Sequence, residues 1–360
     1  MNDREEKPPR PRAGGAEGEA TARPALRAIF VSWGKVPRTD VLAAHLGIPN
    51  YAIRHFYRGY RGTSAPLTAL KYILQAAHTF FVCVRRLPRI VFVTNPPIFA
   101  AIPVWAYARI FRARYVMDFH SGCFIQEHWR RWFRWQRFFA RRAALTLAHN
   151  AENARVLEEW GAAYEVLPSL PPDLGSPTPP PARERPFCVY ICSFKEDEPV
   201  EAFFEAAARI PGADFAVTGR APAGLAEKAP PNVRLAGFLP EEEYRGLVSG
   251  ADVVVALTLR PGTLLYGAQE AIAAHRPLVV SETETLRAYF GGGAVFAENT
   301  PEGLRAGIEE ALAREEELTA RMAEFHRTFL AEGKARLARV VERLQAPARR
   351  GGDARRLQAT

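Results

Sequence analysis

The chain has few cysteines, and they are not spaced as a disulfide or zinc framework would require. Its 360 residues contain four: Cys83, Cys123, Cys188 and Cys192. A disulfide-stapled domain is much denser in cysteine, and a structural zinc site needs two close pairs of ligands. We therefore expect free thiols, as in a reducing compartment, and no cysteine-based metal site.

Long apolar runs are also scarce. The apolar stretches at 72–84 and 98–111 fall short of the ~20 residues that cross a bilayer, and Arg109 interrupts the second. Residues 1–26 are rich in Pro, Gly and charge and have no apolar segment, so they predict a disordered leader rather than a signal peptide. We expect no membrane span and a cytoplasmic location.

Acidic residues are nearly missing from one region. Residues 51–150 contain sixteen Lys and Arg but only two acids, Asp118 and Glu127, so the overall charge of +9 conceals a strongly basic first half. The densest part, 127–142, lies within a single helix predicted at 124–142. Spacing places a basic stripe on one side of this helix and aromatic residues on another, and the predicted membrane-facing residues are Arg130, Trp132, Arg134, Arg137 and Arg141.

Three interpretations of this helix remain open. It is an ordinary amphipathic helix that packs its aromatics inward, or an interfacial helix on an anionic membrane surface. Nucleic acid is the least favoured partner, because no nucleic-acid-binding module accompanies the charge.

Strand-like and helix-like runs alternate along most of the chain, which predicts an α/β fold with two doubly wound, Rossmann-like domains. The predicted divisions are a leader at 1–26, an acceptor domain at 27–168, a Pro-rich linker at 169–186, a donor domain at 187–330, and a helix and tail at 331–360. The predicted strands lie at 28–32, 90–94, 115–118 and 145–148, then at 187–193, 214–218, 233–237, 252–257, 277–280 and 294–297.

Ligands of such sheets bind beyond the carboxyl ends of the strands, so the residues that follow each strand are the candidates. In the first half, Asp118 ends a strand and His120 follows it, which suggests an imidazole that contacts a sugar hydroxyl or moves a proton. The other candidates for the acceptor side or the cleft are Gly34, Lys35, Ser121, Gly122, His149 and Asn150.

In the second half, the run after Ala256 predicts a helix that begins at Thr263 and carries Glu270 two turns inside. A helix start exposes unpaired N–H groups and partial positive charge, which suit a diphosphate, and a carboxylate deeper in the helix suits a ribose hydroxyl. The full set of donor-binding candidates is Ser193, Lys195, Gly219, Phe238, Leu239, Arg260, Gly262, Thr263, Leu264 and Glu270.

Several common motifs are absent. The loop at 31–40 is neither a G-x-G-x-x-G sequence nor a P-loop, which argues against dinucleotide binding and an ATPase. No G-x-S-x-G nucleophile elbow is present, which argues against a hydrolase triad.

The stretch GFLPEEEYRGLVSGADVVVALT, followed by YGAQEAIAAHRPLVVSE, resembles the GT-B glycosyltransferases, most nearly the family-4 type, and the resemblance covers roughly residues 27–330. It implies two Rossmann-like domains that face each other across a cleft and bind a nucleotide-diphosphate sugar. Glu270 matches the second glutamate of the family's E-x7-E motif, whereas Gly262 stands where the first is expected. Ser193 stands in place of a family arginine, with Lys195 nearby, and His120 falls at the family's active-site histidine.

The resemblance further implies transfer of a sugar from the nucleotide-diphosphate sugar as co-substrate, with no cofactor and no essential metal. Retention of configuration is the favoured outcome. A lipid-linked or cell-surface glycan precursor is the expected acceptor, at an anionic membrane surface. Two alternatives remain: a nucleotide-sugar-binding GT-B protein without turnover, and a sugar-nucleotide epimerase, which shares the two-domain fold.

Overall fold

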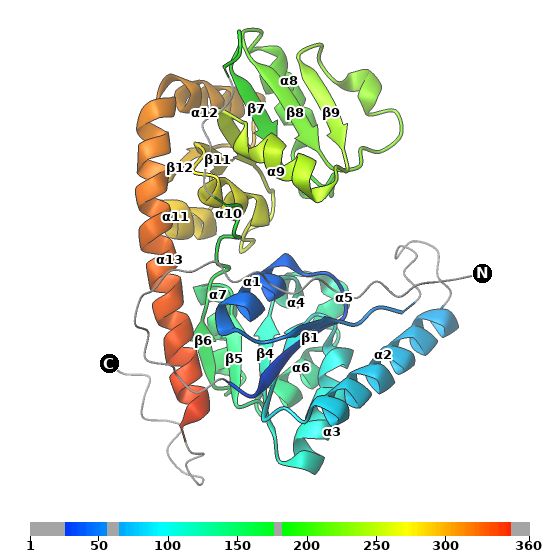
Figure 1. Ribbon diagram of the computed structural model, residues 1–360. Coiled ribbons are helices and arrows are strands. Elements are labelled where there is room, and N and C mark those ends of the chain that lie inside the picture. Colours follow the sequence, from blue (N-terminus) through cyan, green and yellow to red (C-terminus); the bar gives the residue numbers. More distant parts are fainter. Residues whose placement is uncertain (1–25, 56–64, 176–181, 347–360) are drawn as a thin grey trace, which may run out of the picture.

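The computed structural model describes residues 26–55, 65–175 and 182–346, which form two α/β domains stacked on each other (Figure 1). The first sheet has the order β2-β1-β3-β4-β5-β6 and the second β12-β11-β10-β7-β8-β9, and every paired strand is parallel to its neighbour. The predicted fold class is therefore confirmed. Much of the predicted leader, linker and tail (1–25, 176–181 and 347–360) lies outside the described residues.

The strands agree closely with the predicted runs. In the first sheet they are β1 (Ala28–Ser32), β2 (Asn50–Ala52), β3 (Ile90–Asn95), β4 (Arg114–Phe119), β5 (Leu145–Ala148) and β6 (Tyr164–Val166). In the second they are β7 (Phe187–Tyr190), β8 (Asp214–Thr218), β9 (Val233–Gly237), β10 (Val253–Ala256), β11 (Leu278–Ser281) and β12 (Ala294–Ala297). The central strands are buried on both faces, which explains their continuous apolar sequences. The unpredicted strands, β2 and β6, are three-residue edge strands of the first sheet with no fully buried residue.

The helices cover both faces of each sheet (Figure 1). Those of the first domain are α1 (Pro37–Leu46), α2 (Ala65–Arg86), α3 (Ala101–Phe111), α4 (Gly122–Ile125), α5 (Glu127–Arg130), α6 (Phe133–Ala140) and α7 (Ala151–Glu159). Those that follow are α8 (Val200–Ala208), α9 (Glu241–Ser249), α10 (Tyr266–Ala273), α11 (Glu284–Phe290), α12 (Pro301–Ala313) and α13 (Glu315–Gln345).

The single helix predicted at 124–142 is wrong. The chain forms the short helices α4, α5 and α6 instead, with extended backbone at Gln126. The carbonyl of Trp129 accepts from the N–H of Trp132 and from the side-chain amide of Gln136, so a regular helix does not continue there. The four arginines of the predicted stripe are exposed but do not lie on one continuous helix.

The helix predicted to begin at Thr263 begins at Tyr266. Gly262 has a φ of 70° and Leu265 is extended, and neither conformation belongs to an α-helix. Glu270 consequently lies little more than one turn inside α10, and the N–H groups of Thr263 and Leu264 belong to a loop.

Helix α13 joins the two domains along one side of the molecule (Figure 1). Leu318 and Met322, near its start, pack into the cores of the second domain. Leu337, Val340 and Leu344, near its end, pack into a core of the first. The domain boundary predicted at residue 330 falls inside this helix, whose 31 residues extend over both domains.

Helix α2 is longer than the apolar run that was recognised in the sequence. Its 22 residues, from Ala65 to Arg86, include an 18-residue window with a mean hydropathy of 1.4, of which 17% is buried. By length and composition alone it could cross a membrane, a length that the apolar run at 72–84 did not reveal. Helix α2 packs on α3 at the edge of the first domain.

The strand orders place a switch point in each domain. In the first, the chain goes from β1 to the edge strand β2 and returns to β3 on the other side of β1; in the second, β10 pairs with β7 on the side away from β8. Loops that leave such neighbouring strands in opposite directions open a crevice at their carboxyl ends. The two crevices face each other between the domains.

Candidate active site

A cavity of about 460 Å³ lies between the domains at these two switch points. From the first domain it is lined by Val36, Pro37, Arg38, Thr94, Pro96, His120, Ser121, Gly122, Ile125, Gln126, His149 and Ser169. From the second it is lined by Lys195, Asp197, Arg260, Thr263, Leu264, Leu265, Tyr266 and Gln269. Both walls therefore consist largely of residues that follow strands.

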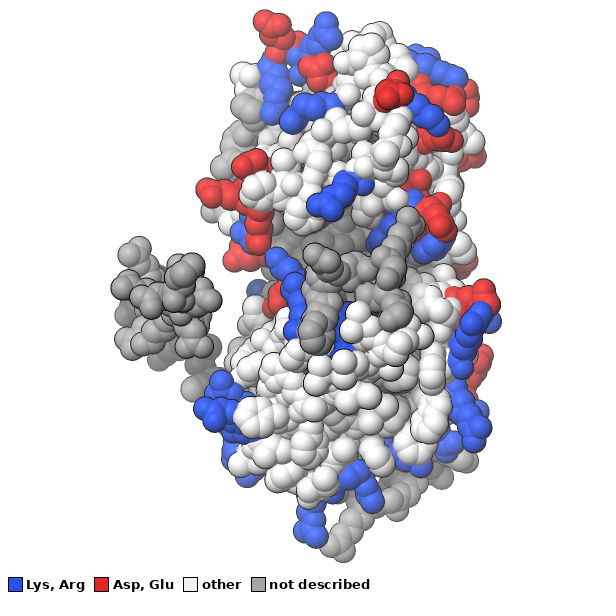
Figure 2. Space-filling view, turned by 90° about the vertical axis from the view of Figure 1, so that its right-hand side faces the viewer, with Lys and Arg blue, Asp and Glu red and all other residues white. Residues whose placement is uncertain are grey.

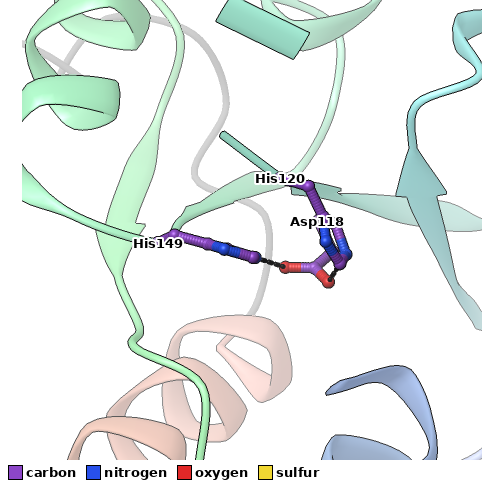
Figure 3. A group of neighbouring side chains, drawn as sticks. All are labelled: Asp118, His120 and His149. Atoms are coloured by element: carbon purple, nitrogen blue, oxygen red, sulfur yellow. Dashed lines mark ion pairs between the residues drawn. The ribbon is translucent and has the colours of Figure 1, made fainter. Parts of the chain in front are cut away.

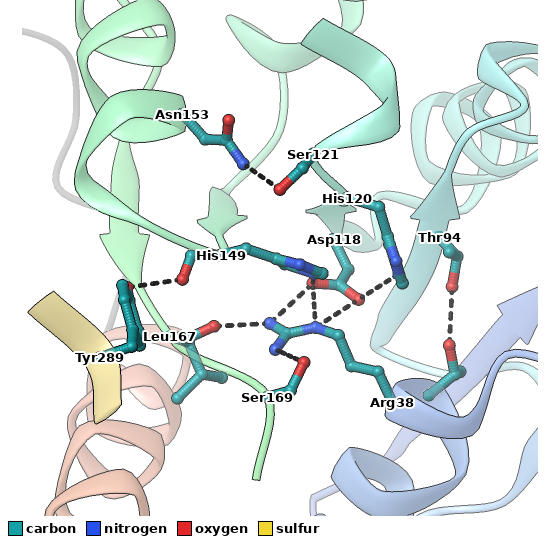
Figure 4. Close-up of polar contacts among 11 residues, drawn as sticks. Arg38, Thr94, Asp118, His120, Ser121, His149, Asn153, Leu167, Ser169 and Tyr289 are labelled. Carbon is teal, nitrogen blue, oxygen red and sulfur yellow. Dashed lines mark hydrogen bonds and ion pairs between the residues drawn. The ribbon is translucent and has the colours of Figure 1, made fainter. Parts of the chain in front are cut away.

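The first-domain wall is built on a buried ion pair. Arg38 is 2% exposed and Asp118 is fully buried, and the guanidinium donates to both carboxylate oxygens at 3.0 to 3.2 Å (Figure 4). Arg38 also donates to the carbonyl of Leu167 and the hydroxyl of Ser169. Most of the hydrogen-bonding capacity of Arg38 is thus used within the protein, which leaves little for an anionic ligand.

Two histidines lie against the same carboxylate. Nε2 of His120 is 3.3 Å from Asp118 Oδ2, and Nε2 of His149 is 3.9 Å from Oδ1 (Figure 3). Neither contact has the geometry of a hydrogen bond, so both are electrostatic. The ring of His149 is buried, whereas the side chain of His120 is 22% exposed and lines the cavity.

Burial and charge fix the ionisation of this group. Burial alone would raise the pKa of Asp118, but the charge of Arg38 and the contact with His120 hold it well below its usual range. Burial, Arg38 and His120 together lower the pKa of His149 well below its ordinary value, so its ring is neutral. The first wall therefore presents His120 as an imidazole held beside a fixed carboxylate.

Asp118, His120 and His149 also have the composition of a metal site, with ligand atoms within 4.8 Å of one another. The position of Arg38 argues against a cation there. Its guanidinium occupies both oxygens of Asp118, so a metal ion would face a fixed positive charge about one hydrogen bond away.

The second-domain wall carries its charges closer to solvent. Arg260 is 39% exposed and pairs with Asp197 at 3.3 Å, and Asp197 also accepts from the hydroxyl of Thr258. Lys195 is exposed and makes no ion pair with any described residue. Arg260 and Lys195 thus bring positive charge to the cavity. Asp197 offsets part of the charge of Arg260, and no described acid pairs with Lys195.

The loop after β7 already binds a carboxylate of the protein itself. Glu198 accepts hydrogen bonds from the backbone N–H groups of Ser193 and Lys195 and from the Ser193 hydroxyl. These donors were assigned by sequence to the donor phosphate. Ser193 does not line the cavity, and a phosphate bound at these N–H groups would have to displace Glu198.

Gly262 contacts the first domain rather than the cavity. Its carbonyl accepts from the side chain of Asn150 at 3.0 Å, and a Cβ at this position would lie 2.6 Å from an oxygen of Glu152. Glu152 also accepts from Thr285 of the second domain. A glycine is required here by the left-handed backbone and by the close approach of the two domains.

Glu270 forms a short hydrogen bond inside the second domain. The hydroxyl of Tyr244 donates to it at 2.6 Å. Burial raises the pKa of Glu270 to about 7, and the Tyr244 hydrogen bond and Arg245 oppose this only in part. The carboxyl is therefore close to half protonated at neutral pH when no ligand is bound.

Gln269, the neighbour of Glu270, is a residue that the sequence analysis missed. It is 1% exposed, lines the cavity, and neither its amide nitrogen nor its amide oxygen has a hydrogen-bond partner among the described residues. A buried amide without partners costs roughly 1–3 kcal/mol. Such a group in a cavity wall is arranged for a ligand that supplies the missing partners.

The comparisons with known proteins agree with this architecture. Residues 195–344, most of the second domain, match the family described as glycosyl transferase-like. Sucrose-phosphate synthase from Thermosynechococcus elongatus has a similar structure, with a TM-score of 0.71 at 12% identity over 88% of this chain and 98% of that one. Anabaena Alr3699/HepE in complex with UDP also matches, with a TM-score of 0.65 at 12% identity over 88% and 99%. No curated protein matches the sequence.

The chain has the GT-B fold of these solved structures, and its second domain is similar to the glycosyl transferase-like family. The resemblance stated from the sequence is confirmed. The same Anabaena protein matches in its complex with UDP-glucose, with a TM-score of 0.64 at 12% identity over 88% of this chain and 99% of that one.

Only some of the predicted site residues line the cavity. Those that line the cavity are His120, Ser121, Gly122, His149, Lys195, Arg260, Thr263 and Leu264. Asp118 lies buried behind the first wall, and Gly262 and Asn150 meet at the domain contact. Glu270 stands one residue beyond Gln269.

The remaining candidates lie farther from the cavity. The side chain of Lys35 pairs with Glu241 across the domains at 3.6 Å, and both side chains are more than 60% exposed. Gly219 has a φ of 90°, and a Cβ there would lie 2.3 Å from the carbonyl oxygen of Cys192, so its role is in the loop backbone. Phe238 is 85% exposed. Gly34 and Leu239 likewise do not line the cavity.

The residues that sequence reasoning missed gave weak signals. Arg38 was visible only as one cation in a basic loop, although it enters a helix directly after Pro37 at a helix start. Gln269 and its neighbour Glu270 are the two polar residues of the segment 267–274, and only Glu270 matched a motif. Asp197 pairs with Arg260 on the cavity wall and Glu198 accepts from the loop after β7, and their positions shortly before α8 gave no sign of either contact.

Proposed function

We propose that this protein is a glycosyltransferase that takes its sugar from a nucleotide-diphosphate sugar bound on the second-domain wall. The observation that carries the proposal is the unpartnered Gln269, which lines the same cavity as the cations Arg260 and Lys195 and as His120. An amide offers both a donor and an acceptor to sugar hydroxyls, and cations offset the charge of a diphosphate. The similar Anabaena protein was solved with UDP and UDP-glucose, which makes UDP-glucose the first donor to test.

In the proposed mechanism, the diphosphate lies near Lys195, Arg260 and the loop at 263–264. Lys195 and Arg260 stabilise the negative charge of the leaving diphosphate, so that no metal ion is needed. Glu270 accepts a hydrogen bond from the ribose, and an apolar base site lies at Phe238 and Leu239. His120 orients the sugar or its acceptor, with its ring held by Asp118, and the transfer retains the anomeric configuration.

The proposed acceptor approaches from the first domain. A lipid-linked diphosphate, as in the assembly of cell-surface glycans, suits a domain whose residues 51–150 hold sixteen cations and two acids. The proposed location is accordingly the cytoplasmic face of a membrane, where the protein would act as a peripheral protein.

The test is the thermal stability of the protein with UDP-, GDP-, ADP- and dTDP-sugars. A ligand that binds only the folded state adds about 2.7 kcal/mol to the free energy of unfolding at one hundred times its Kd. The melting temperature therefore rises. We expect one base to stand out, and Glu270→Ala to reduce its effect. No shift at millimolar concentration with any member would contradict the donor site.

One observation favours a second candidate function, a nucleotide-sugar-binding protein without turnover. Glu198 occupies the amide groups of Ser193 and Lys195, and Gly262 replaces a carboxylate at the domain contact. This second function would be supported if a nucleotide sugar raised the melting temperature while the protein formed no product with any acceptor lipid and left the nucleotide sugar chemically unchanged.

A further inference from the structure

The outer helices of the first domain carry an apolar surface that no described part of the chain covers. On α2, Leu67, Leu70, Ile73, Leu74 and Phe81 are exposed, and on α3, Ile102, Ile110 and Phe111. Trp132 and Trp135, at α6, are 36% and 51% exposed. We call these ten side chains the outer face. Figure 2 shows this side of the molecule, where the first domain presents a broad white surface bordered by blue.

Helix α2 buries two polar residues and leaves large apolar side chains exposed. Its polar residues Gln75 and Thr79 are buried: Gln75 donates to the carbonyl of Ile53, and Thr79 accepts from the indole N–H of Trp33. It also buries Val82 and Cys83, but its larger apolar side chains are exposed, with Ile73 64% and Phe81 61% exposed. A helix that is firmly bonded through its polar side has its apolar side available for a partner.

Aromatic contacts make the outer face continuous. Tyr72 of α2 lies 5.0 Å from Phe99, which in turn lies 4.8 Å from Trp132. Trp105 of α3 contacts Phe138 of α6, which contacts Trp135. The exposed side chains of the three helices therefore belong to one surface rather than to separate patches.

A basic cavity lies where α3 ends. It has a volume of about 1100 Å³ and is lined by Arg109, Arg112, Arg114, Arg142 and Arg343 together with Trp105, Tyr115 and Phe138. Arg109 and Arg112 make no ion pair with a described residue and are exposed beside Ile110 and Phe111 of the outer face. None of the lining residues is acidic, so the cavity suits an anionic group.

We propose that the outer face binds the surface of an anionic lipid bilayer, with the cavity at Arg109 and Arg112 taking a lipid phosphate. Apolar and aromatic side chains enter the boundary of the acyl chains while arginines meet the headgroups. A second copy of the chain is a poorer occupant, because a symmetric contact would bring the two arginine borders together. The proposed function, with its lipid-linked acceptor, supplies the reason for the protein to bind a membrane, whereas the binding surface itself is inferred from the exposed side chains.

This surface differs from the one predicted by sequence. That prediction used Arg130, Arg134, Arg137 and Arg141 as a stripe on one helix. The apolar contribution comes instead mainly from α2 and α3, and the arginines best placed for headgroups are those at the end of α3.

The experiment is sedimentation of the full chain with two kinds of vesicle, phosphatidylcholine alone and phosphatidylcholine with about one third phosphatidylglycerol. We expect binding to the anionic vesicles that weakens when salt rises from about 0.15 to about 0.5 M. The double variant Ile73→Ser, Phe81→Ser should lose at least about ten-fold in partitioning, since both side chains insert. Arg109→Gln, Arg112→Gln should lose binding to anionic vesicles in particular.

The matched control is Arg234→Gln, Arg305→Gln, which removes the same charge from the exposed surface of the second domain and should bind as the wild type does. All the substituted side chains are exposed, so circular dichroism and melting temperatures should be unchanged. A wild type that stays in the supernatant at low salt, or an Ile73→Ser, Phe81→Ser variant that binds like the wild type, would overturn the proposal. Dimerisation that this variant abolishes would show that a second copy is the occupant instead. Because the readout needs neither donor nor turnover, it fails or succeeds independently of the proposed function.

Discussion

The two walls of the cleft treat their polar groups in opposite ways. In the first domain, Arg38 and Asp118 are buried and satisfy each other. In the second, Gln269 is as deeply buried but has no partner, and Glu270 is held near its point of half protonation. A wall whose charges are satisfied internally is a rigid support, whereas a wall with unsatisfied groups is prepared for a ligand.

Two buried glutamines make this comparison direct. Gln136 of the first domain is fully buried, donates to the carbonyl of Trp129 and accepts from Asn95. Gln269 is 1% exposed and makes neither kind of bond with a described residue. The same side chain thus stabilises the fold in one domain and is available for binding in the other.

The largest effect should come from breaking the first wall. Arg38→Ala leaves the Asp118 carboxylate buried without its cation, which should lower the free energy of unfolding by about 3–5 kcal/mol in chemical denaturation. The double variant Arg38→Met, Asp118→Leu should recover most of this loss, because no buried charge remains. A single variant as stable as the wild type would show that the pair is not buried as described.

A smaller effect is expected at Glu270, and it depends on pH. The pKa in the folded protein is about 7, above the ordinary value of 4.5. Its contribution to stability is therefore complete below about pH 4.5 and is lost as the pH rises through 7. Glu270→Gln should be more stable than the wild type at pH 8, by up to ~2 kcal/mol, and nearly equal at pH 4. If the free energy of unfolding of the wild type and of Glu270→Gln depended on pH in the same way, the raised pKa of Glu270 would be contradicted.

The fold could be predicted well from sequence and the wall contacts could not. Apolar runs such as 28–32 and 145–148 are set by local β propensity and burial, so their bounds were correct. The break between α5 and α6 depends on Gln136 reaching the carbonyl of Trp129, seven residues back, which helical periodicity does not encode. The late start of α10 depends on Asn150, 112 residues away, binding Gly262.

The cleft shows the same division. His120, His149, Lys195 and Arg260, all chosen because they follow strands, line the cavity, since position after a parallel strand fixes the edge of the sheet on which a residue lies. Which partner each side chain finds depends on packing between distant elements. Arg38 binding Asp118 and Glu198 filling the loop of Ser193 are contacts of this kind.

The comparison of the two glutamines can be sharpened by matched substitutions. Gln136→Leu removes satisfied hydrogen bonds and should lower the free energy of unfolding by roughly 1–3 kcal/mol. Gln269→Leu removes an unsatisfied amide and should leave stability unchanged or raise it by about 1 kcal/mol. Equal destabilisation of both in urea would mean that Gln269 has a partner in the free protein.

The smallest effect on stability is expected at Arg260. Its pair with Asp197 is partly exposed, so Arg260→Gln should change the free energy of unfolding by only about 0–1 kcal/mol. Nucleotide-sugar affinity should nevertheless fall, because the cation offsets diphosphate charge. A large loss of stability without loss of affinity would assign Arg260 to the fold instead.

The account's central claim is that the second wall is left unsatisfied for a nucleotide-sugar donor, and calorimetric titration of the wild type and Gln269→Leu tests it most directly. With the nucleotide sugar that gives the largest thermal shift, we predict measurable binding by the wild type and an affinity at least roughly ten-fold lower in the variant, at unchanged or higher stability. Equal affinity of the two proteins would contradict the claim.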